Sequence, residues 1–101
     1  MRVAFVDDNE AHRVLMETAF PRVDVYSEPC DALLDYDMVL MDYELGIYNG
    51  LDEARILAAK NPSQAIFIIS AHGHIDCEFK SLPKGDIGVI RETLEPVNHN
   101  L

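Results

Sequence analysis

Residues 38–45 read Met-Val-Leu-Met-Asp-Tyr-Glu-Leu, four apolar residues followed directly by an acidic one. A short, continuous apolar run bounded by turn residues is typical of a strand that is buried on both faces of a parallel sheet. The run therefore predicts a central strand with Asp42 at its carboxyl end. Ligands of open α/β sheets bind outside the carboxyl ends of the strands, which makes Asp42 a candidate site residue.

Apolar segments on both sides of this run predict four more strands. The segment Ala-Ile-Phe-Ile-Ile is the strongest of them, because it is wholly apolar and rich in β-branched residues. The weakest comes just before Pro83. The expected strands cover residues 3–6, 23–27, 65–69 and 78–82.

Helical periodicity occupies most of the gaps between the strands. The expected apolar face of the first helix, which Pro21 ends, consists of Ala11, Val14, Leu15, Thr18 and Ala19. A second helix, capped by Asn49, has an expected face of Leu51, Ala54, Leu57 and Ala58. The last helix begins near Asp86, with Ile87, Ile90, Leu94 and Val97 on its expected face. Only a short helix fits residues 29–34.

Strands that alternate with helices predict a parallel sheet with helices on both faces. One connection is unusually short, because only residues 71–77 separate Ser70 from Glu78. A parallel crossover normally takes about a dozen residues and includes a helix, so the fourth helix is expected to be reduced or absent. The alternative is an antiparallel hairpin through residues 72–74. We favour the shortened crossover because it keeps Lys84 at the active edge of the sheet.

Composition excludes some classes of function. The net charge is −10, from 18 acidic and 8 basic residues, and direct binding of DNA or RNA would need a basic surface. No apolar run reaches the length of a membrane span. Cys30 and Cys77 are far apart and form no CxxC motif, which is the pattern of a reduced intracellular chain.

Charged and polar side chains follow the predicted strands, namely Asp7, Asp8, Asp42, Ser70 and Lys84. Neighbouring parallel strands lie about 4.8 Å apart, so these side chains can converge. Three carboxylates would repel one another, and Mg²⁺ relieves this because it prefers carboxylate, carbonyl, water and phosphate oxygens. A carboxylate beside Mg²⁺ can attack a phosphoryl group and form an acyl phosphate. Lys84 would neutralise the phosphoryl oxygens, and Ser70 would donate a hydrogen bond to one of them.

Five short motifs in this order resemble a two-component response-regulator receiver domain across essentially the whole chain. They are Val-Asp-Asp-Asn-Glu at 6–10, Val-Leu-Met-Asp at 39–42, Asn-Gly-Leu-Asp at 49–52, Ile-Ile-Ser-Ala at 68–71 and Leu-Pro-Lys at 82–84. No single motif is specific, but the five together are. The resemblance implies a single receiver domain over residues 1–101 with a flavodoxin-like, five-stranded parallel sheet in the order 2-1-3-4-5.

The resemblance also assigns roles to the residues at the strand ends. Asp42 would be the phosphoacceptor, with Ser70 as the switch hydroxyl and Lys84 as the site lysine. Lys80 is a rival for that last role, but it lies within the expected strand rather than at its end. The implied ligands of Mg²⁺ are Asp7, Asp8, Asp42 and the backbone carbonyl of Glu44.

A receiver is a cytoplasmic phosphoacceptor of a two-component or phosphorelay system. By the resemblance, its only enzymatic activities would be its own autophosphorylation and autodephosphorylation. A histidine kinase or a histidine phosphotransfer protein would donate the phosphoryl group. Phosphorylation would then switch a surface that binds a downstream protein.

Three features depart from the family pattern. Asp8 and Asp42 are 34 positions apart, which is shorter than usual for receivers. The fourth helix is expected to be lost. Ser81 stands at the position of the family's switch aromatic residue, for which Phe79 or Tyr43 could substitute. These departures concern the output of the signal rather than the phosphorylation chemistry.

Two other functions remain open from the sequence. The chain could be a pseudo-receiver that binds proteins without being phosphorylated. It could also be a small aspartyl phosphatase similar to the haloacid dehalogenases, with Asp42 as nucleophile and Glu44 as acid. Such enzymes usually need a larger chain with a cap and a further acidic motif, so we rank this function below the other two. A receiver cut from a longer protein would give the same motifs.

Overall fold

A five-stranded parallel sheet forms the centre of the chain in a computed structural model that describes residues 1–95. Its strands are β1 (Val3–Val6), β2 (Asp24–Tyr26), β3 (Met38–Asp42), β6 (Ala65–Ser70) and β7 (Lys80–Pro83). They lie in the order β2-β1-β3-β6-β7, and each neighbouring pair is parallel. This is the predicted 2-1-3-4-5 order, so the flavodoxin-like fold class is confirmed.

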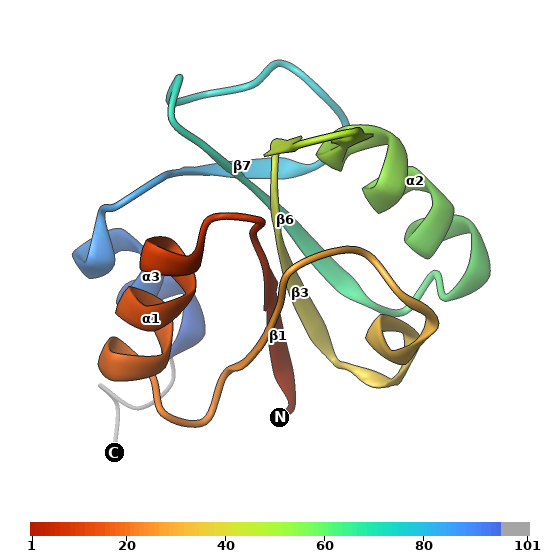
Figure 1. Cartoon of the computed structure of the whole chain (residues 1–101). Helices are drawn as coiled ribbons and strands as arrows, with labels where there is room; N and C mark the ends of the chain where they lie inside the picture. The colour runs from red at the N-terminus through yellow and green to blue at the C-terminus, as the bar shows by residue number, and fades with distance from the viewer. Residues whose placement is uncertain (96–101) are drawn as a thin grey trace.

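Helices cover both faces of the sheet (Figure 1). α1 (Glu10–Ala19) and α3 (Ile87–Leu94) pack on one face. α2 (Gly50–Lys60) and the short 3-10 helix η1 (Asp31–Asp35) pack on the other. No helix within residues 1–95 is long and apolar enough to cross a membrane.

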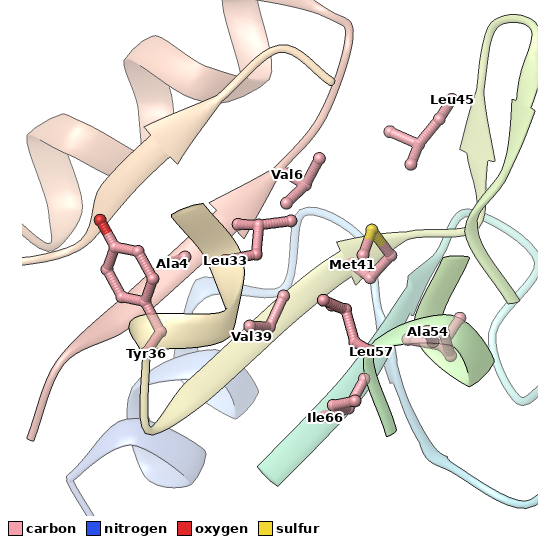
Figure 2. Packing of buried hydrophobic residues seen from close by; sticks show 11 residues of the cluster. Ala4, Val6, Leu33, Tyr36, Val39, Met41, Leu45, Ala54, Leu57 and Ile66 are labelled. Atoms are coloured by element: carbon pink, nitrogen blue, oxygen red, sulfur yellow. The ribbon is translucent and has the colours of Figure 1, made fainter. Parts of the chain in front are cut away.

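Alternate residues of the central strands enter two separate cores, one on each face. Figure 2 shows the core beneath α2 and η1, where Leu57 and Leu33 approach Val39 of β3. The next residue of β3, Leu40, belongs to the core on the opposite face together with Ile90 of α3. β3 is buried at all its positions, as its continuous apolar sequence predicts.

The buried face of α1 is only in small part the one predicted from periodicity, because Ala19 packs against the core but most of the predicted face does not. Val14 and Leu15 are 55% and 44% exposed, whereas Met16 and Phe20 are only 3% and 5% exposed. Helical spacing fits either face, but the face with Met16 and Phe20 carries larger side chains and removes more apolar area from water. The faces predicted for α2 and α3 are confirmed in their described parts. Val97 lies outside the described residues.

The crossover between β6 and β7 contains no helix over residues 71–79. β7 nevertheless pairs parallel with β6, which confirms the shortened crossover and excludes the hairpin. Arg55 of α2 holds this loop in place by donating two hydrogen bonds to the carboxylate of Glu78, from Nε at 2.9 Å and from Nη2 at 3.0 Å. Three partly buried side chains of the loop pack against the core on the α2 side of the sheet, in place of a helix: Ile75, Cys77 and Phe79.

A two-stranded antiparallel hairpin follows β3 and was not expected from the sequence. It consists of β4 (Glu44–Leu45) and β5 (Tyr48–Asn49). Gly50 comes next and passes so close to β3 that a Cβ there would lie 1.9 Å from the carbonyl oxygen of Asp42. The close approach requires glycine and fixes the hairpin beside the end of β3.

Candidate functional site

The parallel register brings four strand ends to the same edge of the sheet. Asp42 ends β3 and Ser70 ends β6, while Asp7 and Lys84 directly follow β1 and β7. The backbone N–H of Lys84 donates to the carbonyl oxygen of Ser70 at 2.9 Å, which holds the end of β7 against β6. The sheet topology therefore assembles the residues predicted to form the site.

Asp7, Asp8 and Asp42 each place a carboxylate oxygen within 4.8 Å of the others. Asp7 and Asp42 are 0% and 2% exposed, and Asp8 lies at the surface. Asp42 Oδ2 is buried without a hydrogen-bond partner among the described residues. Three converging carboxylates, one with an unpartnered oxygen, have the donor chemistry that a hard divalent cation such as Mg²⁺ requires.

Lys84 is the cation that the fold itself supplies to this cluster. Its Nζ lies 3.0 Å from Asp42 Oδ1 and 3.3 Å from Asp7 Oδ2. Partial burial acts to lower the pKa of Lys84, but its contacts with Asp42 and Asp7 outweigh burial and raise that pKa above the ordinary value. Lys80 is exposed on β7. The structure thus places Lys84, and not its rival, against the carboxylates.

The surroundings of Asp42 raise the pKa of its carboxyl group. Burial raises its pKa to about 6, the charges of Asp7 and Asp8 raise it as well, and the hydrogen bond from Lys84 opposes them. A bound cation would lower this pKa, because a positive charge favours the ionised form. The ionisation of Asp42 therefore depends on what else occupies the site.

Asp7 has partners at the start of α1, including its N-cap, that the sequence did not predict. Its Oδ1 accepts a hydrogen bond from the backbone N–H of Asn9 at 2.9 Å, and its Oδ2 lies 3.1 Å from Nδ1 of His12. Its backbone carbonyl accepts a hydrogen bond from Nη1 of Arg13 at 2.8 Å. The only signal in the sequence is that His12 and Arg13 fall in the first turn of a helix that begins beside the aspartates.

Two hydroxyl groups connect the site to the crossover loop. Ser70 Oγ is buried and accepts a hydrogen bond from the backbone N–H of His72 at 3.0 Å. Ser81 Oγ accepts from the N–H of Ile75 at 2.9 Å and lies 3.2 Å from Nδ1 of His74. Ser81, which the resemblance places at the position of the switch aromatic, therefore anchors the loop through its hydroxyl. The suggested substitutes, Phe79 and Tyr43, both pack against the core on the α2 side.

A cleft of about 680 Å³ opens beside the acidic cluster, between Asp8, Lys84 and the β4–β5 hairpin. Glu44 lies at its rim, and its exposed carboxylate is 3.2 Å from Nε2 of His72 in the crossover loop. The assignment of the Glu44 backbone carbonyl as a metal ligand stays a prediction. The cleft opens this edge of the sheet, beside Asp8 and Lys84, to solvent.

No protein-family model and no curated protein matches the sequence of this chain. Solved structures do match it. A CheY-like response-regulator receiver domain protein from Methanospirillum hungatei superposes with a TM-score of 0.77 at 13% identity, covering 98% of this chain and 94% of the other. The response regulator TrrA from Thermotoga maritima, in complex with Mg²⁺ and beryllium fluoride, gives a TM-score of 0.75 at 20% identity over 94% and 96% of the two chains.

A third match is a response regulator from Burkholderia pseudomallei that carries a phosphorylated aspartic acid and a calcium ion. It superposes with a TM-score of 0.70 at 16% identity and covers 99% of this chain and 75% of the other. Identities this low leave the fold as the shared property. The five motifs and the superpositions agree on it, and the chain has the fold of the response-regulator receiver domains.

Proposed function

We propose that this chain is a phosphoacceptor receiver of a two-component or phosphorelay signalling system. The observation that carries the proposal is the buried carboxylate of Asp42, which lies between two further carboxylates and Lys84 at the carboxyl edge of a receiver-type sheet. The donor would be the phosphohistidine of a histidine kinase or a phosphotransfer protein. The matched structures that hold a phosphorylated aspartate or beryllium fluoride support this chemistry.

In the proposed reaction, a carboxylate oxygen of Asp42 attacks the phosphorus of the phosphohistidine. A new P–O bond forms as the P–N bond breaks, and the imidazole leaves with the electron pair and takes up a proton. Lys84 is held 3.0 Å from Asp42 and can neutralise the phosphoryl oxygens as charge develops on them. Later attack by water would break the acyl phosphate and restore the carboxylate.

A magnesium ion would be held by the side chains of Asp7, Asp8 and Asp42 together with the backbone carbonyl of Glu44. When bound, it would supply positive charge to the phosphoryl oxygens. The cluster fits such an ion because its carboxylates converge and Asp42 Oδ2 has no partner among the described residues.

Intact mass after incubation with acetyl phosphate and Mg²⁺ tests this function directly. We expect the mass of one phosphoryl group to be added to the wild-type chain. The addition should be absent for Asp42→Asn and absent when EDTA removes the metal. If the wild type binds Mg²⁺ in a separate titration but takes no phosphoryl group from acetyl phosphate or a phosphohistidine donor, the chain is instead a phosphorylation-independent binding module.

The signal would leave the site through the crossover loop, residues 71–79. A phosphoryl group on Asp42 adds acceptor oxygens, and the side chain of Ser70 would rotate so that Oγ moves toward one of them and its hydroxyl donates to it. Ser70 Oγ now accepts from the N–H of His72, so this movement removes the acceptor of that N–H. The loop would then present a changed surface to a downstream protein, and this surface would take the place of the fourth helix that other receivers have. We propose that this signalling takes place in the cytoplasm.

Hydrogen exchange can detect this coupling. With beryllium fluoride and Mg²⁺, the amide of His72 should exchange several-fold faster than in the metal-free wild type, because it loses its hydrogen bond. In Ser70→Ala this amide should exchange fast in both states. Ser81→Ala is the matched control, since it removes a loop hydroxyl but leaves the Ser70–His72 bond in place. Equal protection of His72 in the two states of the wild type would argue against this route.

The phosphatase alternative is weakened by the position of Glu44. A general acid must reach the leaving group, yet this carboxylate is exposed and contacts His72 of the loop. The receiver function requires only the backbone of Glu44. If the wild type hydrolysed a model phosphate ester and Asp42→Asn did not, the phosphatase function would be favoured.

A further inference from the structure

His12 contacts the acidic cluster from α1, and the proposed function assigns it no role. Its Nδ1 lies 3.1 Å from Oδ2 of Asp7, whose side chain is completely buried. We propose that His12 is a positioning residue of the cation site, which holds the carboxylate of Asp7 in its binding orientation. The inference rests on the proposed function, because it concerns how the cluster is kept ready for Mg²⁺ and for the phosphoryl group.

The start of α1 is built to deliver this contact. Asn9 caps the helix, and its Oδ1 accepts a hydrogen bond from the backbone N–H of His12 at 3.2 Å. The next residue, Arg13, donates through Nη1 to the backbone carbonyl of Asp7 at 2.8 Å. Two consecutive residues of one helical turn therefore hold Asp7, one at its main chain and the other at its side chain.

The chemistry of the contact fixes the direction of the hydrogen bond. An ionised carboxylate can only accept, so Nδ1 of His12 carries the proton and donates to Asp7 Oδ2. Histidine is suited to this position because a ring nitrogen donates in a fixed direction. Groups that orient metal-binding side chains in this way typically change metal affinity about 10-fold to 100-fold when they are removed.

The other donor to Asp7 Oδ2 is Lys84, at 3.3 Å, and it is shared with Asp42. In the proposed reaction Lys84 turns toward the phosphoryl oxygens, which loosens its hold on Asp7. His12 and the backbone N–H of Asn9 would then be the donors that keep the carboxylate in place.

Titration calorimetry with Mg²⁺, and with Mn²⁺ as a second probe, tests this role without measuring activity. His12→Leu and His12→Ala should weaken binding of both ions by about 10-fold or more. His12→Asn should stay within about threefold of the wild type, since the asparagine amide can place an N–H near the position of Nδ1. His74→Leu is the matched control, because that histidine contacts Ser81 in the crossover loop and not the aspartates.

The rate of phosphorylation by acetyl phosphate separates positioning from a general loss of structure. At saturating Mg²⁺ the Leu and Ala variants should regain most of the wild-type rate, whereas at low Mg²⁺ they should fall behind in proportion to their affinity. Unchanged cation affinity in Leu and Ala, or equal loss in all three His12 variants, would overturn the role of His12 and leave the receiver function standing. A wild type that binds neither ion would overturn both.

Discussion

Replacing Lys84 with methionine should slow the phosphorylation of Asp42 by acetyl phosphate by about 100-fold or more, the effect typical of losing one group that stabilises developing charge. Methionine keeps the length and the apolar stem of the lysine but not its ammonium group. That group lies 3.0 Å from Asp42 and is the cation nearest the carboxylate that would carry the phosphoryl group. The measurement is the rate of phosphoryl incorporation by intact mass at saturating Mg²⁺.

Lys80→Met is the matched control for this change. Lys80 begins β7 and Lys84 directly follows it, but Lys80 is exposed, so its replacement should leave the phosphorylation rate near that of the wild type. Lys84→Met should not weaken Mg²⁺ binding, because removing a positive charge from the site reduces its repulsion of the ion. A slow Lys80→Met variant alongside a normal Lys84→Met would reverse the assignment of the site lysine.

The parallel sheet was predictable from the strand patterns, and the order of its strands was implied by the resemblance to receiver domains. β3 and β6 are continuous apolar runs that end in Asp42 and Ser70, and a buried parallel sheet requires such runs. Once the strands are parallel and adjacent, their carboxyl ends meet, so Asp7 and Lys84 are brought to the same edge. Predicting this edge therefore required the order of the strands, which the resemblance implied, but no knowledge of the side-chain geometry.

The sequence pattern did not predict the features that depend on how side chains pack in the folded chain. The predicted face of α1 was wrong at Val14 and Leu15, because periodicity alone does not weigh that face against the one that carries Met16 and Phe20. The β4–β5 hairpin depends on a close passage at Gly50, which no local pattern reveals. The contact of His12 with Asp7 was missed for the same reason, because it depends on how α1 is rotated against the sheet.

Replacing Asp42 with asparagine should raise the free energy of unfolding of the metal-free protein. Asp42 is 2% exposed, and burial is the main reason that the pKa of its carboxyl group rises from the ordinary 3.8 to about 6. At neutral pH the folded chain therefore holds a charge that it disfavours, at a cost of about 3 kcal/mol from about 1.4 kcal/mol per pKa unit. Asparagine has nearly the same shape, and its carbonyl oxygen can still accept the hydrogen bond from Lys84.

The pH dependence of this gain follows from the direction of the pKa shift. Because the folded pKa lies above the unfolded one, the wild type loses stability as the pH rises from about 4 to about 6, and the loss is complete above that range. The advantage of Asp42→Asn should thus be near zero at about pH 4 and reach about 3 kcal/mol by about pH 7. Urea unfolding followed by circular dichroism at several pH values measures it.

Mg²⁺ should reverse the order of the two proteins, because the ion binds the folded wild type and offsets the charge that asparagine removes. Asp31→Asn is a suitable control, since this exposed residue of η1 lies outside the acidic cluster and its replacement should change stability little. A gain for Asp42→Asn that is the same at pH 5 and pH 8 would mean that ionisation of Asp42 is not its source. The charge that weakens the metal-free fold is, in the proposed function, the charge that binds the ion and attacks phosphorus, so a stability deficit at this position is what a receiver site should show.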